Sequence, residues 1–224
     1  EDESGDARQF TQSLAKKAEE AGVEFLYNSE ILGFENTQDR VLGVNVIREG
    51  RHQILRADNY VLCLGSFSAI LARKLGLTLN IYPAKGYSIT VPVKSEAAAF
   101  NVSLTDDEYK LVYSRLGDRI RVAGTAELSG YNRALNLTRC RTIVRRTAEL
   151  MPDAGHWERA EFWTGLRPAT PSNVPYIGKS HFGNLYLNTG HGTLGWTHSC
   201  GSAAALADIV AGRTPDVDFA FTGL

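Results

Sequence analysis

The chain has 224 residues, 43% of them hydrophobic and 22% charged, with a formal net charge of -1. This composition is typical of a globular protein, and the charge balance gives no electrostatic reason to expect binding to nucleic acid. No run of eighteen apolar residues is present, so no transmembrane segment is predicted. Three cysteines without a CxxC spacing predict neither a disulfide framework nor a zinc site, and they favour a cytoplasmic protein.

The first third of the chain predicts one helix followed by short strands. Apolar residues recur at helical spacing in residues 6–21, and Gly22 ends this amphipathic pattern. Residues 22–57 have the β-branched, aromatic and glycine pattern of a short antiparallel meander. The segment YVLCLG at 60–65 is apolar on both faces, which predicts a strand in the middle of a helix-covered sheet, with a helix at 68–75 after it.

The middle third predicts a second sheet. Alternating segments at 87–93, 109–116 and 119–127 are each typical of a strand with one buried face, and the sheet is expected to be largely antiparallel. Residues 138–150 predict a helix that ends before Pro152. Its arginines have no aromatic residues between them, so a solvated face is favoured over a nucleic-acid patch.

The last third contains a strand, a glycine-rich turn and a helix in that order. The strand is NLYLN at 184–188, the turn is GHGTLGWT at 190–197, and the helix ends at Gly212. Glycines let a ligand approach the backbone, and the start of a helix offers free N–H groups to an anion or a flavin edge. The turn matches neither GxGxxG nor a Walker A sequence, so a tight turn closing a βα unit remains the alternative.

Few side chains stand out as candidates for chemistry. Arg167 lies in the segment GLRP, predicted to be a loop, where it could hold a carboxylate or form a structural salt bridge. His191 and His198 have no metal-ligand spacing, and no metal site is predicted. Ser199 is not part of a GxSxG nucleophile elbow.

Four segments together resemble the D-amino acid oxidase-like superfamily of FAD-dependent oxidoreductases, and within it the bacterial D-amino acid dehydrogenases (small subunit). The segments are YVLCLGSFS, PAKGYSITVPV, GLRPATPSNVPYIG and the stretch from NLYLN to GRTP. The resemblance implies an α/β (α+β mixed) fold. It consists of a partial, Rossmann-like FAD-binding domain at 1–80 and 180–224 and an antiparallel-sheet substrate-binding domain at 81–179.

The resemblance also implies FAD as the cofactor and assigns residues to its site. In the family a GxGxxG segment binds the ADP half of FAD, and these residues contain none; the only methionine is Met151, so the chain is expected to begin inside a longer natural protein. The resemblance places Ile31 near the adenine, and Gly65 and Ser66 near the ADP portion. It places eight residues around the flavin ring: Gly190, His191, Gly192, Thr193, Leu194, Gly195, Trp196 and Thr197.

The substrate side and the reaction follow from the same resemblance. Arg167 is expected to bind the substrate carboxylate and Tyr87 to line the substrate side, with no obligatory catalytic acid or base. The expected reaction is oxidative deamination of D-amino acids such as D-alanine, with electrons passed to a respiratory acceptor such as a quinone, in peripheral contact with the inner membrane. Two alternatives stay open: a glycine or sarcosine oxidase-like amine oxidase, and a catalytically inert fragment that binds FAD poorly.

Overall fold

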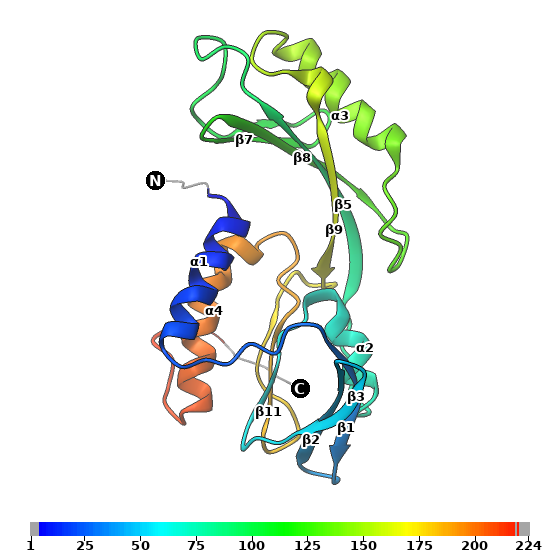
Figure 1. Ribbon diagram of the computed structural model, residues 1–224, viewed down its shortest axis with the longest axis vertical. Helices are drawn as coiled ribbons and strands as arrows, with labels where there is room; N and C mark the ends of the chain where they lie inside the picture. Colours follow the sequence, from blue (N-terminus) through cyan, green and yellow to red (C-terminus); the bar gives the residue numbers. More distant parts are fainter. Residues whose placement is uncertain (1–4, 218, 220–224) are drawn as a thin grey trace. The chain divides into compact units, whose positions relative to one another are not determined.

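In the computed structural model of the protein, which describes residues 5–217 and 219, the chain divides into two compact units (Figure 1). One unit is Glu1–Gly22 with Ala84–Leu166, and the other is Val23–Pro83 with Arg167–Leu224. Each unit has its own hydrophobic core. The predicted boundaries differ from this division among the described residues. Residues 5–22 group with the sheet of the predicted substrate domain, and residues 167–179 group with the other unit. The ends of the predicted FAD-binding domain, at 1–4, 218 and 220–224, lie outside the described residues.

A five-stranded sheet, in the order β6-β7-β8-β5-β9, forms the centre of the first unit. Its strands are β5 (Tyr82–Pro92), β6 (Leu104–Asp106), β7 (Leu111–Leu116), β8 (Arg119–Glu127) and β9 (Glu161–Ala169). The pairs β6/β7, β7/β8 and β5/β8 are antiparallel, which confirms the predicted second sheet. Burial alternates along β8, as expected for a strand with one face in a core.

Helix α3 (Leu137–Leu150) covers this sheet and buries Cys140 and Ile143 in the same cluster as Ile89 and Val122. The helix begins where it does because the side chain of Asn136 accepts two backbone hydrogen bonds from its first turn. A short 3₁₀-helix, η2 (Trp157–Arg159), lies between α3 and β9. The helix predicted at 138–150 is therefore confirmed.

The predicted N-terminal helix is also present, as α1 (Ala7–Glu20), but its apolar side is not buried among the described residues. Phe10 is 41% exposed and Leu14 is 53% exposed. Asp6 caps the helix by accepting two backbone hydrogen bonds, and its carboxylate also pairs with Arg119 of β8 at 3.1 Å. This ion pair connects α1 to the five-stranded sheet.

The second unit contains two three-stranded sheets and two helices. The first sheet is the antiparallel meander β1 (Ser29–Asn36), β2 (Val41–Arg48) and β3 (Arg51–Leu55), as predicted. The second has the order β10-β11-β4 and consists of β10 (Tyr176–Lys179), β11 (Leu185–Thr189) and β4 (Tyr60–Leu62). The 3₁₀-helix η1 (Gly65–Phe67), α2 (Ser68–Arg73) and α4 (Gly195–Val210) complete the unit. No helix in the described part of the chain is both long and apolar enough to cross a bilayer.

The position of β4 differs from the prediction. It has three residues rather than six, and it lies at the edge of its sheet, where it pairs in parallel with β11. Val61 is 46% exposed. The strand ends early because the chain turns into η1 at Gly65, whose φ of +53° is a conformation that glycine adopts easily.

Asn184 connects three segments of the second unit before β11 begins. Its buried amide accepts a hydrogen bond from the N–H of Val41 at 2.9 Å and donates to the carbonyls of Val41 (2.9 Å) and Asp58 (3.2 Å). One side chain therefore satisfies three backbone groups that come from two distant parts of the chain.

We expect Asn184→Ala to lower the free energy of unfolding by about 2–4 kcal/mol, because buried backbone groups would lose their partners. Urea denaturation measures this loss. The exposed Asn101→Ala is the matched control and should change stability by less than about 0.5 kcal/mol. Equal effects of the two substitutions would contradict this interpretation.

Candidate functional site

The glycine-rich turn after β11 is shaped by close packing. Gly190 has a φ of +84°, and a Cβ atom there would lie 2.9 Å from Cγ2 of Thr170 and 3.3 Å from Cδ2 of Tyr176. Both the backbone conformation and the space therefore exclude a larger residue. Gly192 also has a positive φ, of +54°, but a Cβ atom there would meet nothing within 4 Å. The first glycine is required by packing and the second by backbone geometry alone.

The segment that contains Arg167 was predicted to be a loop, but it forms the end of strand β9. The carbonyl of Pro168 accepts a hydrogen bond from the N–H of Gly192 at 3.0 Å. This bond places the half-buried Arg167 one residue from the contact with the glycine-rich turn. Burial lowers the pKa of Arg167, but from a value so high that the guanidinium stays charged at neutral pH.

The start of η1 meets the same two segments. The hydroxyl of Thr189 donates to the carbonyl of Gly65 at 3.0 Å, and a Cβ atom on Gly65 would lie 3.9 Å from Cγ of Pro168. Ser66 follows and is buried. The residues predicted to bind FAD (Gly65, Ser66 and the turn) and the arginine predicted to bind the substrate carboxylate (Arg167) therefore come from three neighbouring segments of one unit.

Helix α4 begins at Gly195, inside the segment 190–197 that was predicted to be the turn. Its N-cap residue makes no side-chain hydrogen bond to the first turn. The N-cap position is Leu194, which has no side-chain hydrogen bond to the helix. Serine, threonine, aspartate and asparagine are the usual residues there. The partial positive charge of this helix start is therefore not offset by a cap from Leu194, which suits an electronegative ligand edge.

His191 lies inside this arrangement and is held in its neutral form. Its Nε2 atom is 2.9 Å from Oγ of Ser202 in α4, and its ring centre is 6.3 Å from that of His198. Burial lowers the pKa of His191, and the nearby His198 lowers it further. A polar pocket of about 210 Å³ is lined by Asn188, His191, Gly195, Ser199 and Ser202.

Ile31 is not brought to the glycine-rich turn. It lies on β1 and lines a separate apolar pocket of about 190 Å³, which also includes Leu62 and Leu64. Leu64 directly precedes Gly65, so this pocket is connected along the chain to the segment that contacts Thr189 before the turn.

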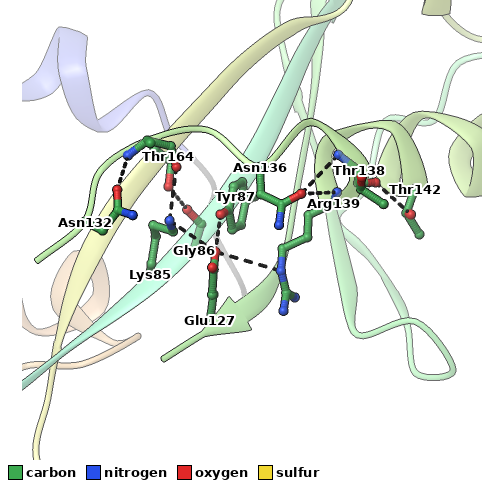
Figure 2. Close-up of polar contacts among 11 residues, drawn as sticks. Lys85, Gly86, Tyr87, Glu127, Asn132, Asn136, Thr138, Arg139, Thr142 and Thr164 are labelled. Carbon is green, nitrogen blue, oxygen red and sulfur yellow. Dashed lines mark hydrogen bonds and ion pairs between the residues drawn. The ribbon is translucent and has the colours of Figure 1, made fainter. Parts of the chain in front are cut away.

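Tyr87 lies on β5, in the other unit, and its side chain is 1% exposed. Its hydroxyl donates a hydrogen bond to the carboxylate of Glu127, which also pairs with Lys85 at 3.1 Å (Figure 2). Four polar residues with contacts in or near these sites were not predicted from the sequence: Lys85, Glu127, Thr189 and Ser202. The period of two along a strand places Lys85 on the same face as Tyr87, and that signal could have identified it.

The described residues contain no group of three or more histidine, cysteine, aspartate or glutamate side chains that could hold a metal ion. Cys63, Cys140 and Cys200 are free thiols. The polar groups of the candidate site are therefore backbone amides, hydroxyls, the side-chain amide of Asn188, the guanidinium of Arg167 and the imidazole of His191.

Comparisons with known proteins agree on one family. The model of the family described as "FAD dependent oxidoreductase" matches residues 1–209. A D-amino acid dehydrogenase of Dechloromonas aromatica is 52% identical over 98% of this chain and 53% of its own length. One of Paramagnetospirillum magneticum is 54% identical over 95% of this chain and 50% of its own length.

The solved structures agree with the predicted fold. A glycine oxidase from Geobacillus kaustophilus superposes with a TM-score of 0.80 at 24% identity, over 95% of this chain and 56% of the oxidase. An L-proline dehydrogenase from P.horikoshii has a TM-score of 0.77 at 19% identity, over 91% of this chain and 55% of that structure. The mixed α/β fold predicted from sequence is confirmed. The chain spans about half the length of the curated relatives that it matches.

Substitution of the two turn glycines should separate packing from backbone strain. We expect Gly192→Ala to cost about 1–2 kcal/mol of stability from the left-handed backbone alone. Gly190→Ala should cost clearly more, because its methyl group would also collide with Thr170. Urea denaturation of both variants tests this order, and an equal loss would show that the close contact at Gly190 is unimportant.

We also expect His191 to titrate below the ordinary histidine pKa of about 6.5. The unfolded chain then binds the proton first as the pH falls, so stability is greatest above the ordinary pKa and is lost as the pH falls toward the lowered value. His198→Gln should raise the pKa of His191 only partly, because burial is the larger cause. NMR titration of the ring measures both, and a pKa at or above the ordinary value in the unsubstituted protein would contradict this description.

Proposed function

Because this chain belongs to the family of FAD-dependent oxidoreductases, we propose that the natural protein that carries it oxidises small D-amino acids, such as D-alanine, to 2-oxo acids and ammonia. The support is the identity of about half of all residues with relatives named D-amino acid dehydrogenase. Those relatives are about twice as long as this chain, so the proposal concerns the whole natural protein.

The residues of the second unit fit a flavin cofactor. A turn with two positive-φ glycines allows a flat ring to approach the backbone, and the start of α4 suits the electron-rich edge of that ring. We assign Gly190 to Thr197, together with Gly65 and Ser66, to this site, and Ile31 to its adenine side. When bound, FAD supplies the two-electron oxidation.

The observation that carries the proposal is the hydrogen bond between Gly192 and the carbonyl of Pro168. It holds the backbone of the residue after Arg167, whose side chain is charged and half-buried, beside the turn assigned to the flavin. A guanidinium can hold a carboxylate through two parallel hydrogen bonds, so Arg167 would fix the orientation of an amino acid substrate. Tyr87 is a weaker candidate for the substrate side, because its side chain is buried and its hydroxyl already donates to Glu127.

No side chain is assigned as a catalytic acid or base. The substrate must react with its amine neutral, and water then converts the imino acid product to the 2-oxo acid and ammonia. His191 is held neutral, and we assign it to the cofactor site rather than to proton transfer. Nor do we assign a metal ion to the reaction.

The wider roles follow from the same proposal. We assign FAD binding to the unit that contains β11 and α4, and substrate binding to residues 81–179, which include Arg167 of that unit and Tyr87 of the other. Electrons would pass to a respiratory acceptor such as a quinone, with peripheral contact at the inner membrane. Because the relatives are about twice as long, we expect these 224 residues alone to retain FAD poorly. A flavin-retaining preparation of this chain would contradict that expectation.

Arg167→Ala should raise the KM for D-alanine at least about tenfold with a smaller change in kcat, because it removes an interaction with the substrate carboxylate. The assay is D-alanine-dependent reduction of an artificial electron acceptor by the natural protein. Arg40→Ala, which alters an exposed arginine of the same unit, is the control.

Turnover unaffected by Arg167→Ala would refute the carboxylate role. Absence of turnover with every D-amino acid, in a protein that holds FAD, would instead refute the substrate class. It would favour a glycine or sarcosine oxidase-like activity.

A further inference from the structure

A lysine is buried inside the five-stranded sheet, where charged side chains are rare unless they are paired. Lys85 lies on β5 and its side chain is 2% exposed. Its ammonium group donates to the carbonyl of Ala134 at 3.0 Å and pairs with Oε2 of Glu127 at 3.1 Å (Figure 2). The lysine therefore connects the sheet with the segment at 128–136, which leads from β8 into α3.

A β-bulge brings these groups together. Lys85 lies opposite Glu127, whereas Tyr87 lies opposite Gly124, so β8 contains one extra residue between the two pairs. Thr125 lies within this bulge and has a φ of +57°. Bulges change the direction of side chains and are frequent beside functional sites. Here the carboxylate of Glu127 faces both Lys85 and the hydroxyl of Tyr87.

The interactions within this group favour the charged forms of both Lys85 and Glu127. Burial opposes the charged form of Lys85, but its interactions with Tyr87 and Glu127 outweigh burial and raise its pKa. The hydrogen bond from Tyr87, followed by that from Lys85, lowers the pKa of Glu127. Burial, followed by the contact with Glu127, raises the pKa of Tyr87. At neutral pH the carboxylate of Glu127 therefore faces an ammonium and a neutral phenol, and the guanidinium of Arg139 lies 3.8 Å from it.

The segment at 128–136 is held at several points. The side chain of Asn132 accepts a hydrogen bond from the N–H of Ala134 at 2.8 Å, and Asn136 caps α3. Lys85 adds the contact that fixes this segment to the sheet. Leu128 and Tyr131 are exposed within the segment, so its arrangement decides which apolar side chains it presents.

We propose that Lys85 is a positioning residue of the substrate side: through Glu127 and the Ala134 carbonyl, it holds the Tyr87 side chain and residues 128–136 in a single arrangement. This inference rests on the proposed function, in which Tyr87 lines the substrate side. The lysine acts through other residues and does not contact the reacting atoms. Its loss should therefore affect substrate binding more than the chemical step.

The test replaces the ammonium by an uncharged chain of similar length, as Lys85→Met in the natural FAD-containing protein. Hydrogen exchange of the backbone amides at 128–136 should become about tenfold faster, because the segment loses its contact with the sheet. The KM for D-alanine should rise about fivefold, with kcat and FAD content nearly unchanged. Lys85→Arg, which keeps charge and donors, should restore part of both effects.

Lys94→Met is the matched control, because Lys94 pairs with Asp153 at 2.8 Å at an exposed position of the same unit. It should leave the exchange at 128–136 and the KM unchanged. If Lys85→Met does not fold, Glu127→Gln replaces it. That substitution removes the charge of the carboxylate while keeping its size, and the same two effects are expected.

Exchange and KM that both match the unsubstituted protein would overturn the proposal. Faster exchange with an unchanged KM would also overturn it, because the contact would then only stabilise the fold. If the unsubstituted protein oxidises no D-amino acid, the proposed function fails separately. In that case two measurements on Lys85→Met test whether Lys85 positions Tyr87 and residues 128–136: the exchange data and the near-ultraviolet circular dichroism. An unchanged tyrosine signal would overturn the positioning role.

Discussion

The candidate site depends on one backbone hydrogen bond, from the N–H of Gly192 to the carbonyl of Pro168. It joins the end of β9, which provides Arg167, to the turn that leads from β11 into α4. The close approach at Gly190 and the bond between Thr189 and Gly65 hold the same three segments together. Together these contacts hold the glycine-rich turn, where we propose that the flavin ring lies, next to the backbone of Arg167.

Much of this arrangement could be predicted from the sequence. The meander at β1–β3 and the antiparallel sheet follow from the alternation of apolar residues, and the strand, turn and helix at the end of the chain follow from glycine spacing. Two features could not be predicted. A proline usually argues against a strand, but β9 is an edge strand, where Pro168 costs no hydrogen bond within the sheet. Glu127 reaches Lys85 only because of a bulge, which a strict period of two cannot show.

The charged and polar groups of the two units are used differently. In the second unit, the glycine-rich turn and the start of α4 provide an electropositive environment, and His191 is kept neutral beside them. In the first unit, a buried ammonium and a phenol share the carboxylate of Glu127, which also pairs with Arg139 of α3 at 3.8 Å. The first arrangement suits a bound cofactor, whereas the second suits the fixing of a substrate-side surface.

We propose that the natural protein is a flavoenzyme that oxidises D-amino acids. The most direct measurement is the visible absorbance of its bound flavin under anaerobic conditions, after addition of D-alanine or L-alanine without any electron acceptor. We expect D-alanine to bleach the flavin absorbance and L-alanine to leave it unchanged. A flavin that is reduced by dithionite but by no D-amino acid would contradict it.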